Sequence, residues 1–258
     1  VQKTPGLTLK PVVPQAPSWI YFPDQFDPQS PWHDLRVRQA ANLAIDRDGM
    51  NQALFLGFSK VTNSIVPYTF EYYWQPPPAV YDPQKAKKRL AEAGYPDGFD
   101  AGLFFVDSVY TNVAEIAANN LAAIGIRLNL QPFERAGFLA DYSAKKLRHG
   151  ILRGASGAFG NAATRLASFV VKGGAYAYGS YPDIDELYPQ QDDELDRKKR
   201  AAILEKMQRL VHEKAIYAPL FQLAFINGIG PRVSQSGFGL IPGYPYTAPY
   251  EDITIKGA

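Results

Sequence analysis

The positions where helices begin and end are the strongest constraint on how this chain can fold. Residues 34–47 read D-L-R-V-R-Q-A-A-N-L-A-I-D-R, and residues 81–99 read Y-D-P-Q-K-A-K-K-R-L-A-E-A-G-Y-P-D-G-F. An aspartate before each apolar pattern can accept hydrogen bonds from the free N–H groups of a first helical turn. A glycine after the pattern supplies the left-handed residue that often ends a helix. These segments predict helices over residues 35–43, 47–56 and 83–93.

Strand-forming segments alternate with helical ones along the rest of the chain. In residues 126–131, Ile and Leu alternate with Arg, Asn and Gln, which is the period-two pattern of a half-buried strand. The predicted strands cover 18–23, 103–106, 126–131, the start of 151–163, and 218–226. Further helices are predicted over 113–124, 133–146 and 196–213, with a helical turn at 185–188. Such alternation is typical of an α/β domain built on an open sheet. Because composition does not shift along the 258 residues, we predict one domain.

The charge balance and the absence of cysteine exclude several kinds of protein. Lys and Arg number 27 against 25 Asp and Glu, so the chain lacks the basic excess that is typical of nucleic-acid binding. With no cysteine there are no disulfides, thiolate metal sites or cysteine nucleophiles. No apolar run in the sequence is long enough to span a bilayer.

The first 17 residues are rich in proline and lack the basic and apolar segments of a signal peptide. Two interpretations are open, a cytosolic protein or one whose start has been removed. We favour removal, and of more than a signal peptide.

Motifs for catalysis or metal binding are missing from the sequence. His33, His149 and His212 are far apart, and the acidic run 192–194 fits the start of the helix that follows it better than a metal site. The sequence has neither a G-x-S-x-G elbow nor a phosphate-binding loop. We therefore predict no catalytic residue, metal or cofactor. A hydrolase that uses paired carboxylates stays open as an alternative, because such a pair forms only in space.

Residues 151–181 are the best candidate for a ligand-binding segment. Glycine and alanine there allow a ligand to approach the backbone closely. Arg153 and Arg165 supply planar cationic forks that suit a carboxylate. The aromatic rings of the segment belong to Phe159, Tyr176, Tyr178 and Tyr181. A flexible surface loop with ordinary salt bridges explains the same residues equally well.

Five segments, in this order, resemble the extracellular solute-binding proteins of family 5, which serve peptide- and nickel-type ABC transporters. These segments are 34–47 and 81–99, then A-A-N-N-L-A-A-I-G-I-R-L-N-L, Y-P-D-I-D-E-L and D-R-K-K-R-A-A-I-L-E-K-M-Q-R-L-V-H-E-K-A-I-Y-A-P-L-F. The resemblance implies a periplasmic-binding-protein-like fold of type II, with an open mixed sheet flanked by helices. It also implies two lobes that close on a ligand by hinge motion, followed by docking on a membrane permease.

The resemblance further implies that residues 1–258 form the C-terminal lobe only, without its N-terminal partner. Residues 1–23 would be the hinge-proximal segment, and 228–258 the return crossing and tail. The expected location is periplasmic, or extracellular and membrane-associated. A ligand-sensing module for a membrane receptor is a second alternative, since it shares the cleft and differs only in its partner.

One departure from the family pattern bears on the ligand. Peptide-binding members resemble one another in a Trp-x-x-Asp-type segment whose aspartate pairs with the peptide α-amine, whereas no acidic residue lies between Arg148 and Asp183 here. We therefore expect a small organic anion held by Arg153, with ring stacking, rather than a free peptide. The predicted ligand-binding residues are Trp19, Tyr21, Arg153, Ser156, Phe159, Asn161, Arg165 and Tyr178.

Overall fold

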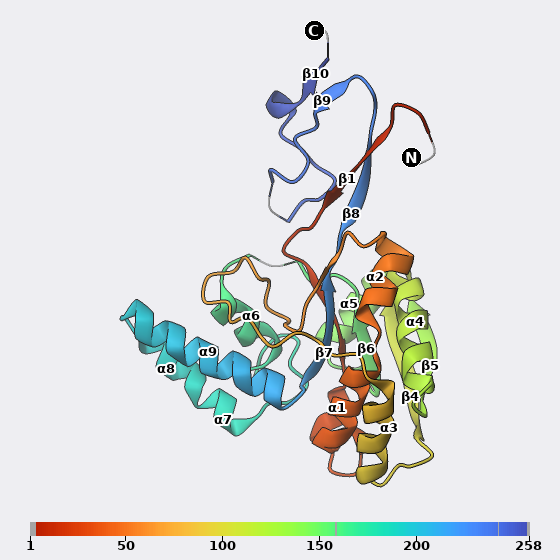
Figure 1. Ribbon diagram of the computed structural model, residues 1–258. Coiled ribbons are helices and arrows are strands. Elements are labelled where there is room, and N and C mark those ends of the chain that lie inside the picture. The colour runs from red at the N-terminus through yellow and green to blue at the C-terminus, as the bar shows by residue number, and fades with distance from the viewer. Residues whose placement is uncertain (1–3, 158, 242, 257–258) are drawn as a thin grey trace.

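A mixed sheet with helices on both faces forms the body of the protein, and a narrow ribbon leads from it to a small tail (Figure 1). The computed structural model describes residues 4–157, 159–241 and 243–256. The body and the tail are joined twice, once near each end of the chain. This arrangement places the segments 8–12 and 225–229 side by side.

The central sheet has six strands in the order β3–β7–β2–β6–β4–β5. They are β2 (Pro17–Tyr21), β3 (Lys60–Val61), β4 (Phe99–Asp107), β5 (Ile126–Phe133), β6 (Gly150–Arg153) and β7 (Tyr217–Gln222). Strand β4 runs parallel to β5 and β6, whereas β2 is antiparallel to β6 and β7. The predicted α/β fold with an open mixed sheet flanked by helices is confirmed.

Two groups of helices enclose this sheet. The first group is α1 (Leu35–Ala44), α2 (Arg47–Phe55), α3 (Pro83–Glu92) and α4 (Thr111–Ala122). The second is α5 (Arg135–Ser143), α6 (Ala162–Phe169), α7 (Pro182–Asp185), α8 (Leu187–Asp193) and α9 (Arg197–Glu213). Short 3-10 helices are η1 (Pro23–Phe26), η2 (Pro31–His33), η3 (Ser108–Tyr110) and η4 (Tyr250–Asp252).

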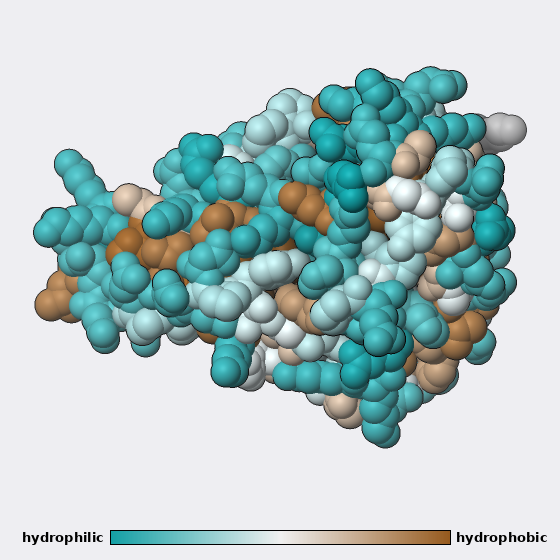
Figure 2. Space-filling view, turned by 90° about the horizontal axis from the view of Figure 1, so that it is seen from below, coloured by the Kyte–Doolittle hydropathy of each residue, from teal (hydrophilic) through white to brown (hydrophobic). Residues whose placement is uncertain are grey.

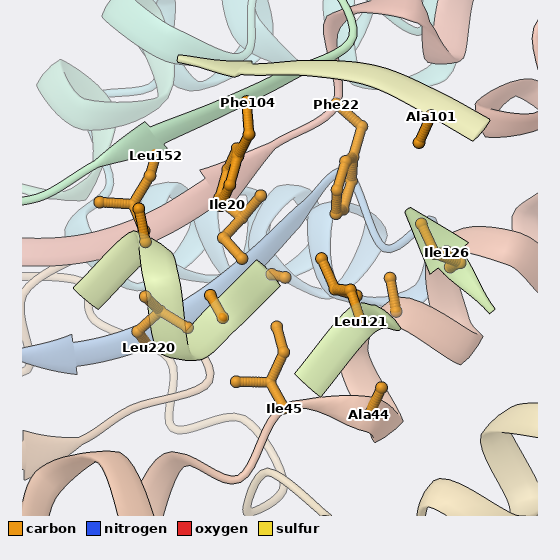
Figure 3. Close-up of a cluster of buried hydrophobic side chains, with 14 of the residues drawn as sticks. Ile20, Phe22, Ala44, Ile45, Ala101, Phe104, Leu121, Ile126, Leu152 and Leu220 are labelled. Carbon is orange, nitrogen blue, oxygen red and sulfur yellow. The ribbon is translucent and has the colours of Figure 1, made fainter. Parts of the chain in front are cut away.

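Successive side chains along a strand point to opposite faces of the sheet, so the sheet contributes side chains to two separate hydrophobic cores, one on each face. Ile20 and Phe22 lie in the first core, together with Leu152, Phe104 and Leu220 from the neighbouring strands (Figure 3). The helices of the first group close this core. Trp19 and Tyr21 lie in the second core, which the second group of helices covers. Arg153, which is opposite Trp19 in the pairing of β6 with β2, and Arg165, which lies on α6 of the second group of helices, are both on the side of this second core.

The strand predicted over 218–226 is two strands, so that prediction was wrong. Strand β7 ends at Gln222 inside the central sheet, and β8 (Phe225–Ile229) begins after a break of two residues. Strand β8 leaves the body and pairs antiparallel with β1 (Thr8–Val12), which the sequence does not predict. Strands β9 (Val233–Gln235) and β10 (Thr254–Ile255) pair with each other in the tail. A continuous apolar run cannot show that its two halves pair with different partners.

The helix starts predicted from aspartates are confirmed. Asp34, Asp46 and Asp82 accept hydrogen bonds from the N–H groups of Arg36, Gly49 and Lys85, each at 2.8 Å. The sequence does not predict α6 or α8, so the flexible-loop interpretation of 151–181 was wrong for residues 162–169. In α6 the apolar residues lie in a run dominated by alanine, which hides the helical period.

Seen from the end opposite the tail, the surface is mostly hydrophilic (Figure 2). The clearest hydrophobic strip lies at the left, over the end of the body formed by α8 and α9. Leu195, between these helices, is 96% exposed. Most large apolar side chains of the body are instead in the two cores.

Two glycines meet where the loop after α3 enters β4. The Gly125 carbonyl oxygen accepts a hydrogen bond from the Phe99 N–H group at 3.0 Å, and a Cβ added to Gly98 would lie 2.0 Å from that oxygen. Gly98 also has φ +74°, and Gly94 has φ +97° with nothing within 4 Å of its added Cβ. A side chain at either position would be strained by the left-handed backbone, but only one at Gly98 would also clash with the backbone of Gly125.

Gly98→Ala is therefore expected to lower the free energy of unfolding by about 3 kcal/mol, from strain and overpacking together. Gly94→Ala should cost only about 1 kcal/mol, because strain acts there alone. Urea unfolding followed by circular dichroism measures both. Equal losses for the two variants would contradict the close approach of Gly98 and Gly125.

Candidate functional site

The candidate site lies at the edge of the sheet where the parallel strands end. Strands β4, β5 and β6 have their carboxyl ends at this edge, the usual position of ligand sites in open α/β sheets. Residues 154–157 follow β6 directly, and Ser156 donates its N–H group to the Pro17 carbonyl oxygen at 3.0 Å. Because Pro17 begins β2, the ribbon β1–β8 leaves the body from this same edge.

Arg153 and Trp19 are direct neighbours across strands β6 and β2. Residues opposite each other in an antiparallel pair share one face of the sheet, so the Arg153 side chain lies on the second-core face with Trp19. Arg153 is half-buried, and its Nε atom is buried without a hydrogen-bond partner. Within the described ranges, none of the salt bridges involves Arg153. Arg153 is therefore a cation without a carboxylate partner in this part of the chain.

Arg165 is a second guanidinium close by, and its role is different. It is 2% exposed and lies against the rings of Trp19 and Phe169, with Cζ 5.4 and 5.0 Å from their centres. Its Nη1 and Nη2 atoms donate to the Oγ and carbonyl oxygen of Ser156, both at 2.8 Å. Burial, and then the nearby Arg153, lower the pKa of Arg165 to about 9. Arg165 thus fixes the start of the loop after β6 while staying protonated at neutral pH.

Tyrosine rings stack on one another close to the two arginines. Tyr142 stacks on Tyr176 and Tyr178, with ring centres 5.2 and 5.9 Å apart. Tyr178 donates its N–H group to the Tyr21 hydroxyl at 3.2 Å and its own hydroxyl to the Tyr142 carbonyl oxygen at 3.0 Å. Burial raises the pKa of the Tyr142 hydroxyl, and Arg153 and Arg165 oppose part of this shift.

Polar atoms without partners are concentrated here. Among the described residues, five buried side-chain nitrogen or oxygen atoms have no hydrogen-bond partner, and four of them belong to this group. They are Trp19 Nε1, Tyr142 OH, Arg153 Nε and Arg165 Nε. Buried polar groups are normally hydrogen-bonded, so an orphaned cluster calls for an explanation. Three of the atoms are donors and the fourth is a hydroxyl, which is the composition of a site for an acceptor-rich, anionic group.

Six of the eight predicted ligand-binding residues come together in this group. They are Trp19, Tyr21, Arg153, Ser156, Arg165 and Tyr178. Phe159 lies apart, 66% exposed, with its ring 6.5 Å from that of Tyr244 in the tail. Asn161 starts α6, and its Oδ1 accepts from the N–H groups of Ala163 and Thr164. That all eight residues contact a ligand stays a prediction.

Sequence reasoning missed three residues that shape the group. Tyr142 comes from α5, Phe169 from the end of α6, and Tyr217 from the start of β7. Tyr217 stacks on Tyr21 at 4.8 Å and packs edge-on against Trp19 at 5.8 Å. Tyr142 and Phe169 are buried residues of their helices like others around them, and Tyr217 lies in a strand that is buried at every position. The sequence therefore carries no signal that separates them from other core residues.

The buried tyrosines make stability depend on alkaline pH. Burial raises the pKa of Tyr21, Tyr142 and Tyr217 above the ordinary value near 10. As the pH rises, the unfolded chain loses these protons before the folded protein does. The stabilising contribution of these hydroxyl groups is therefore complete below about pH 10 and decreases above it. Arg165 acts oppositely, because its lowered pKa makes the folded state gain stability between about pH 9 and 12.

Tyr142→Phe should lose less stability between pH 8 and pH 11 than the unsubstituted protein, by on the order of 1 kcal/mol, because the variant has no buried hydroxyl at this position whose proton the unfolded chain loses first. Urea unfolding of both proteins at the two pH values is the measurement. An equal change of stability in the two proteins would mean that the Tyr142 hydroxyl is not buried as described.

No group of three or more His, Asp or Glu side chains in the described ranges could hold a metal ion. None of the helices in residues 4–157, 159–241 and 243–256 has the length and apolarity that a membrane crossing requires.

Comparison with known proteins gives a consistent result. The profile of the family described as Bacterial extracellular solute-binding proteins, family 5 Middle, matches residues 1–177. Heme-binding protein A of Haemophilus influenzae is 28% identical over 225 residues, which are 82% of this chain and 41% of that protein. The glutathione-binding protein GsiB of Salmonella choleraesuis is 33% identical over 119 residues, 45% of this chain and 23% of that protein.

A solved structure shows the same fold. The periplasmic binding protein DppA of Helicobacter pylori, in complex with the peptide STSA, superposes with a TM-score of 0.82 at 22% sequence identity. The match covers 99% of this chain and 50% of that one. The chain thus spans half or less of the length of these relatives. Because the family profile matches more than half of the chain, the protein belongs to the bacterial extracellular solute-binding proteins of family 5.

Proposed function

We propose that this protein is the solute-binding component of an ABC importer and that residues 1–258 form its C-terminal lobe. Membership of family 5 carries this proposal. The relatives named above are binding proteins for heme, glutathione or a peptide, which fits solute capture and not a hydrolase or a receptor-linked sensor. Residues 1–23 would be the hinge-proximal segment and 228–258 the return crossing and tail.

In this proposal the protein performs no catalysis. It works in the periplasm, or outside the cell attached to the membrane, and passes its solute to a permease. The ribbon β1–β8 fits a hinge, because two strands in opposite directions connect the body to the tail. A second lobe placed beyond the ribbon would face the carboxyl ends of β4, β5 and β6. The candidate group around Arg153 would then line a cleft between two lobes.

The solute that fits this group best is a small organic anion. Arg153 and Arg165 are two guanidinium groups without a carboxylate partner among the described residues, and Arg153 is the more exposed one. Arg153 would donate a bidentate pair of hydrogen bonds to the anion. Arg165 would act through Ser156, by holding the loop after β6 in place.

The remaining predicted residues take subsidiary roles. Tyr178 and Trp19 would form the aromatic wall next to Arg153, although Trp19 is enclosed by Phe169 and Tyr217 in this structure. Phe159 and Asn161 would approach the solute from the loop before α6. Heme carries two carboxylates, so an anion of this kind is compatible with the family.

Calorimetry on the full-length protein tests the proposal. A panel of small carboxylates, aromatic ones included, is titrated alongside di- and tripeptides with free amino groups. We expect micromolar or tighter binding for a carboxylate and none for the peptides. Tight binding of peptides, with no binding of carboxylates, would refute the anion assignment. Turnover of any titrated compound would refute the binding-protein assignment itself.

A further inference from the structure

We propose that the protein has a second small-molecule site, separate from the group around Arg153, which takes a small organic anion with an apolar or aromatic body. This site is a cavity of about 550 Å³ at the β3–β7 edge of the sheet. Its walls come from α1, α3, α9 and the segment 63–80. A volume of this size is in the range of ordinary small-molecule pockets. The inference does not depend on the proposed transport function.

The wall formed by segment 63–80 is fixed by hydrogen bonds. At its neck, the Asn63 side-chain amide donates to the Pro77 carbonyl oxygen at 3.1 Å. Further along, Gln208 of α9 accepts from the Trp74 N–H group at 3.1 Å and donates to the Tyr72 carbonyl oxygen at 2.8 Å. The cavity is therefore formed in advance, which reduces the ordering that a ligand would have to impose.

Part of the cavity lining is apolar and part is aromatic. The buried apolar part consists of Ile65, Val66, Leu166 and Tyr217. Trp74 supplies a further aromatic ring, which lies 5.8 Å from that of His212. These surfaces would accept the aliphatic or aromatic part of a ligand, as pockets for small molecules commonly do.

Positive charge dominates the polar part of the lining. Arg47, Lys85 and Arg89 face one acidic residue, Glu213. In the part of the chain that the structure describes, none of these four side chains forms a salt bridge. Burial lowers the pKa of His212, so this side chain is neutral at pH 7 and leaves the balance positive. An anion is the ligand that this lining would favour.

The three basic side chains of the lining differ in their burial and hydrogen bonding. Arg47 is buried and already donates to the carbonyl oxygens of Pro219, Asn42 and Ile45, so it supplies charge rather than a free donor. Arg89 is half-exposed and makes one hydrogen bond, from Nη1 to Gln39 Oε1 at 2.8 Å. Together with the exposed Lys85, Arg89 can still turn donors toward an anion at the mouth.

The cavity and the first site share Tyr217 as a wall but differ in the residues proposed to bind a ligand. None of the eight predicted ligand-binding residues lines it. Trp74 lines the cavity, whereas Trp19 belongs to the candidate site around Arg153 and Trp32 lies in the first core. The chain has three tryptophans. In an NMR spectrum the indole N–H signal of Trp74 therefore reports on the cavity, and that of Trp32 serves as a reference in the first core.

The test uses indole-3-acetate, and its uncharged amide of the same shape, titrated into the ¹⁵N-labelled protein of 258 residues. We expect the acetate to shift the Trp74 indole signal and to bind about tenfold more tightly than the amide, because only the acetate forms charge-assisted hydrogen bonds. Substituting Trp74→Phe assigns the signal. The Trp32 signal should not move with it.

Paired variants on the same helix separate a specific site from general attraction. The double variant Lys85→Gln with Arg89→Gln removes two charges at the cavity and should abolish the preference for the acetate. The double variant Lys87→Gln with Lys88→Gln removes the same charge from exposed positions of α3 that do not line the cavity, and should preserve the preference. The proposal fails if Trp74 does not respond at millimolar acetate, if the amide binds equally well, or if both double variants weaken binding alike.

Discussion

Arg153→Gln in the full-length protein is expected to weaken binding of its solute roughly 30- to 100-fold. The reason is that the substitution removes a bidentate, charge-assisted contact worth about 2–3 kcal/mol. Arg153 is half-buried, pairs with no carboxylate in the described residues, and lies beside Trp19 on the face that carries the orphaned polar atoms. A loss of this size follows only if the guanidinium touches the anion itself.

Two further variants define the effect. Arg153→Lys keeps the charge but loses the planar fork, so we expect an intermediate loss of affinity. Arg127→Gln removes a charge from an exposed position on β5 and should leave affinity within about twofold, as expected of screened surface charge. Calorimetry with the same solute measures all three. Equal affinity for Arg153→Gln and the unsubstituted protein would remove Arg153 from the site.

Arg38→Met is expected to lower the free energy of unfolding by about 3–5 kcal/mol. Arg38 is 3% exposed on α1 and donates to the carbonyl oxygens of Trp32, His33 and Lys214. Its Nη2 atom also reaches the Tyr181 hydroxyl at 3.2 Å. Methionine fills much of the same volume, but it leaves these buried acceptors without donors. The connection between the start of α1 and the end of α9 would be lost with them.

Arg36 provides the matched control, because it lies two residues earlier on the same helix and is exposed. Its ion pair with Asp34 is at the surface, so Arg36→Met should change stability little. Urea unfolding at pH 7 compares the two variants. Similar effects would show that burial of the Arg38 guanidinium does not hold these elements together.

Much of the architecture could be predicted because its signals are local. An aspartate before a helix needs only the next three residues to act, and Asp34, Asp46 and Asp82 all do so as expected. The period-two pattern of 126–131 likewise depends on the segment itself. The division of 218–226 into β7 and β8 could not be predicted, because it depends on pairing with residues about 200 positions away.

The candidate site was predictable in residue type and not in geometry. The absence of acidic residues between Arg148 and Asp183 made Arg153 and Arg165 candidates for binding an anion. The sequence treats these two arginines alike, whereas the structure has Arg165 buried against Ser156 and Arg153 half-exposed. That difference arises because α6 carries Arg165 over Trp19. The cavity beside Trp74 has no sequence signal, because its lining comes from segments up to 180 residues apart.

Native mass spectrometry of the intact, full-length protein, purified without denaturation, tests the central claim most directly. A solute held in a preformed site by uncompensated guanidinium groups should co-purify, at least in part, and be released on unfolding. We predict a small organic molecule that is released unchanged and is negatively charged at neutral pH. A released peptide with a free amino terminus, or a neutral or cationic molecule, would contradict the account.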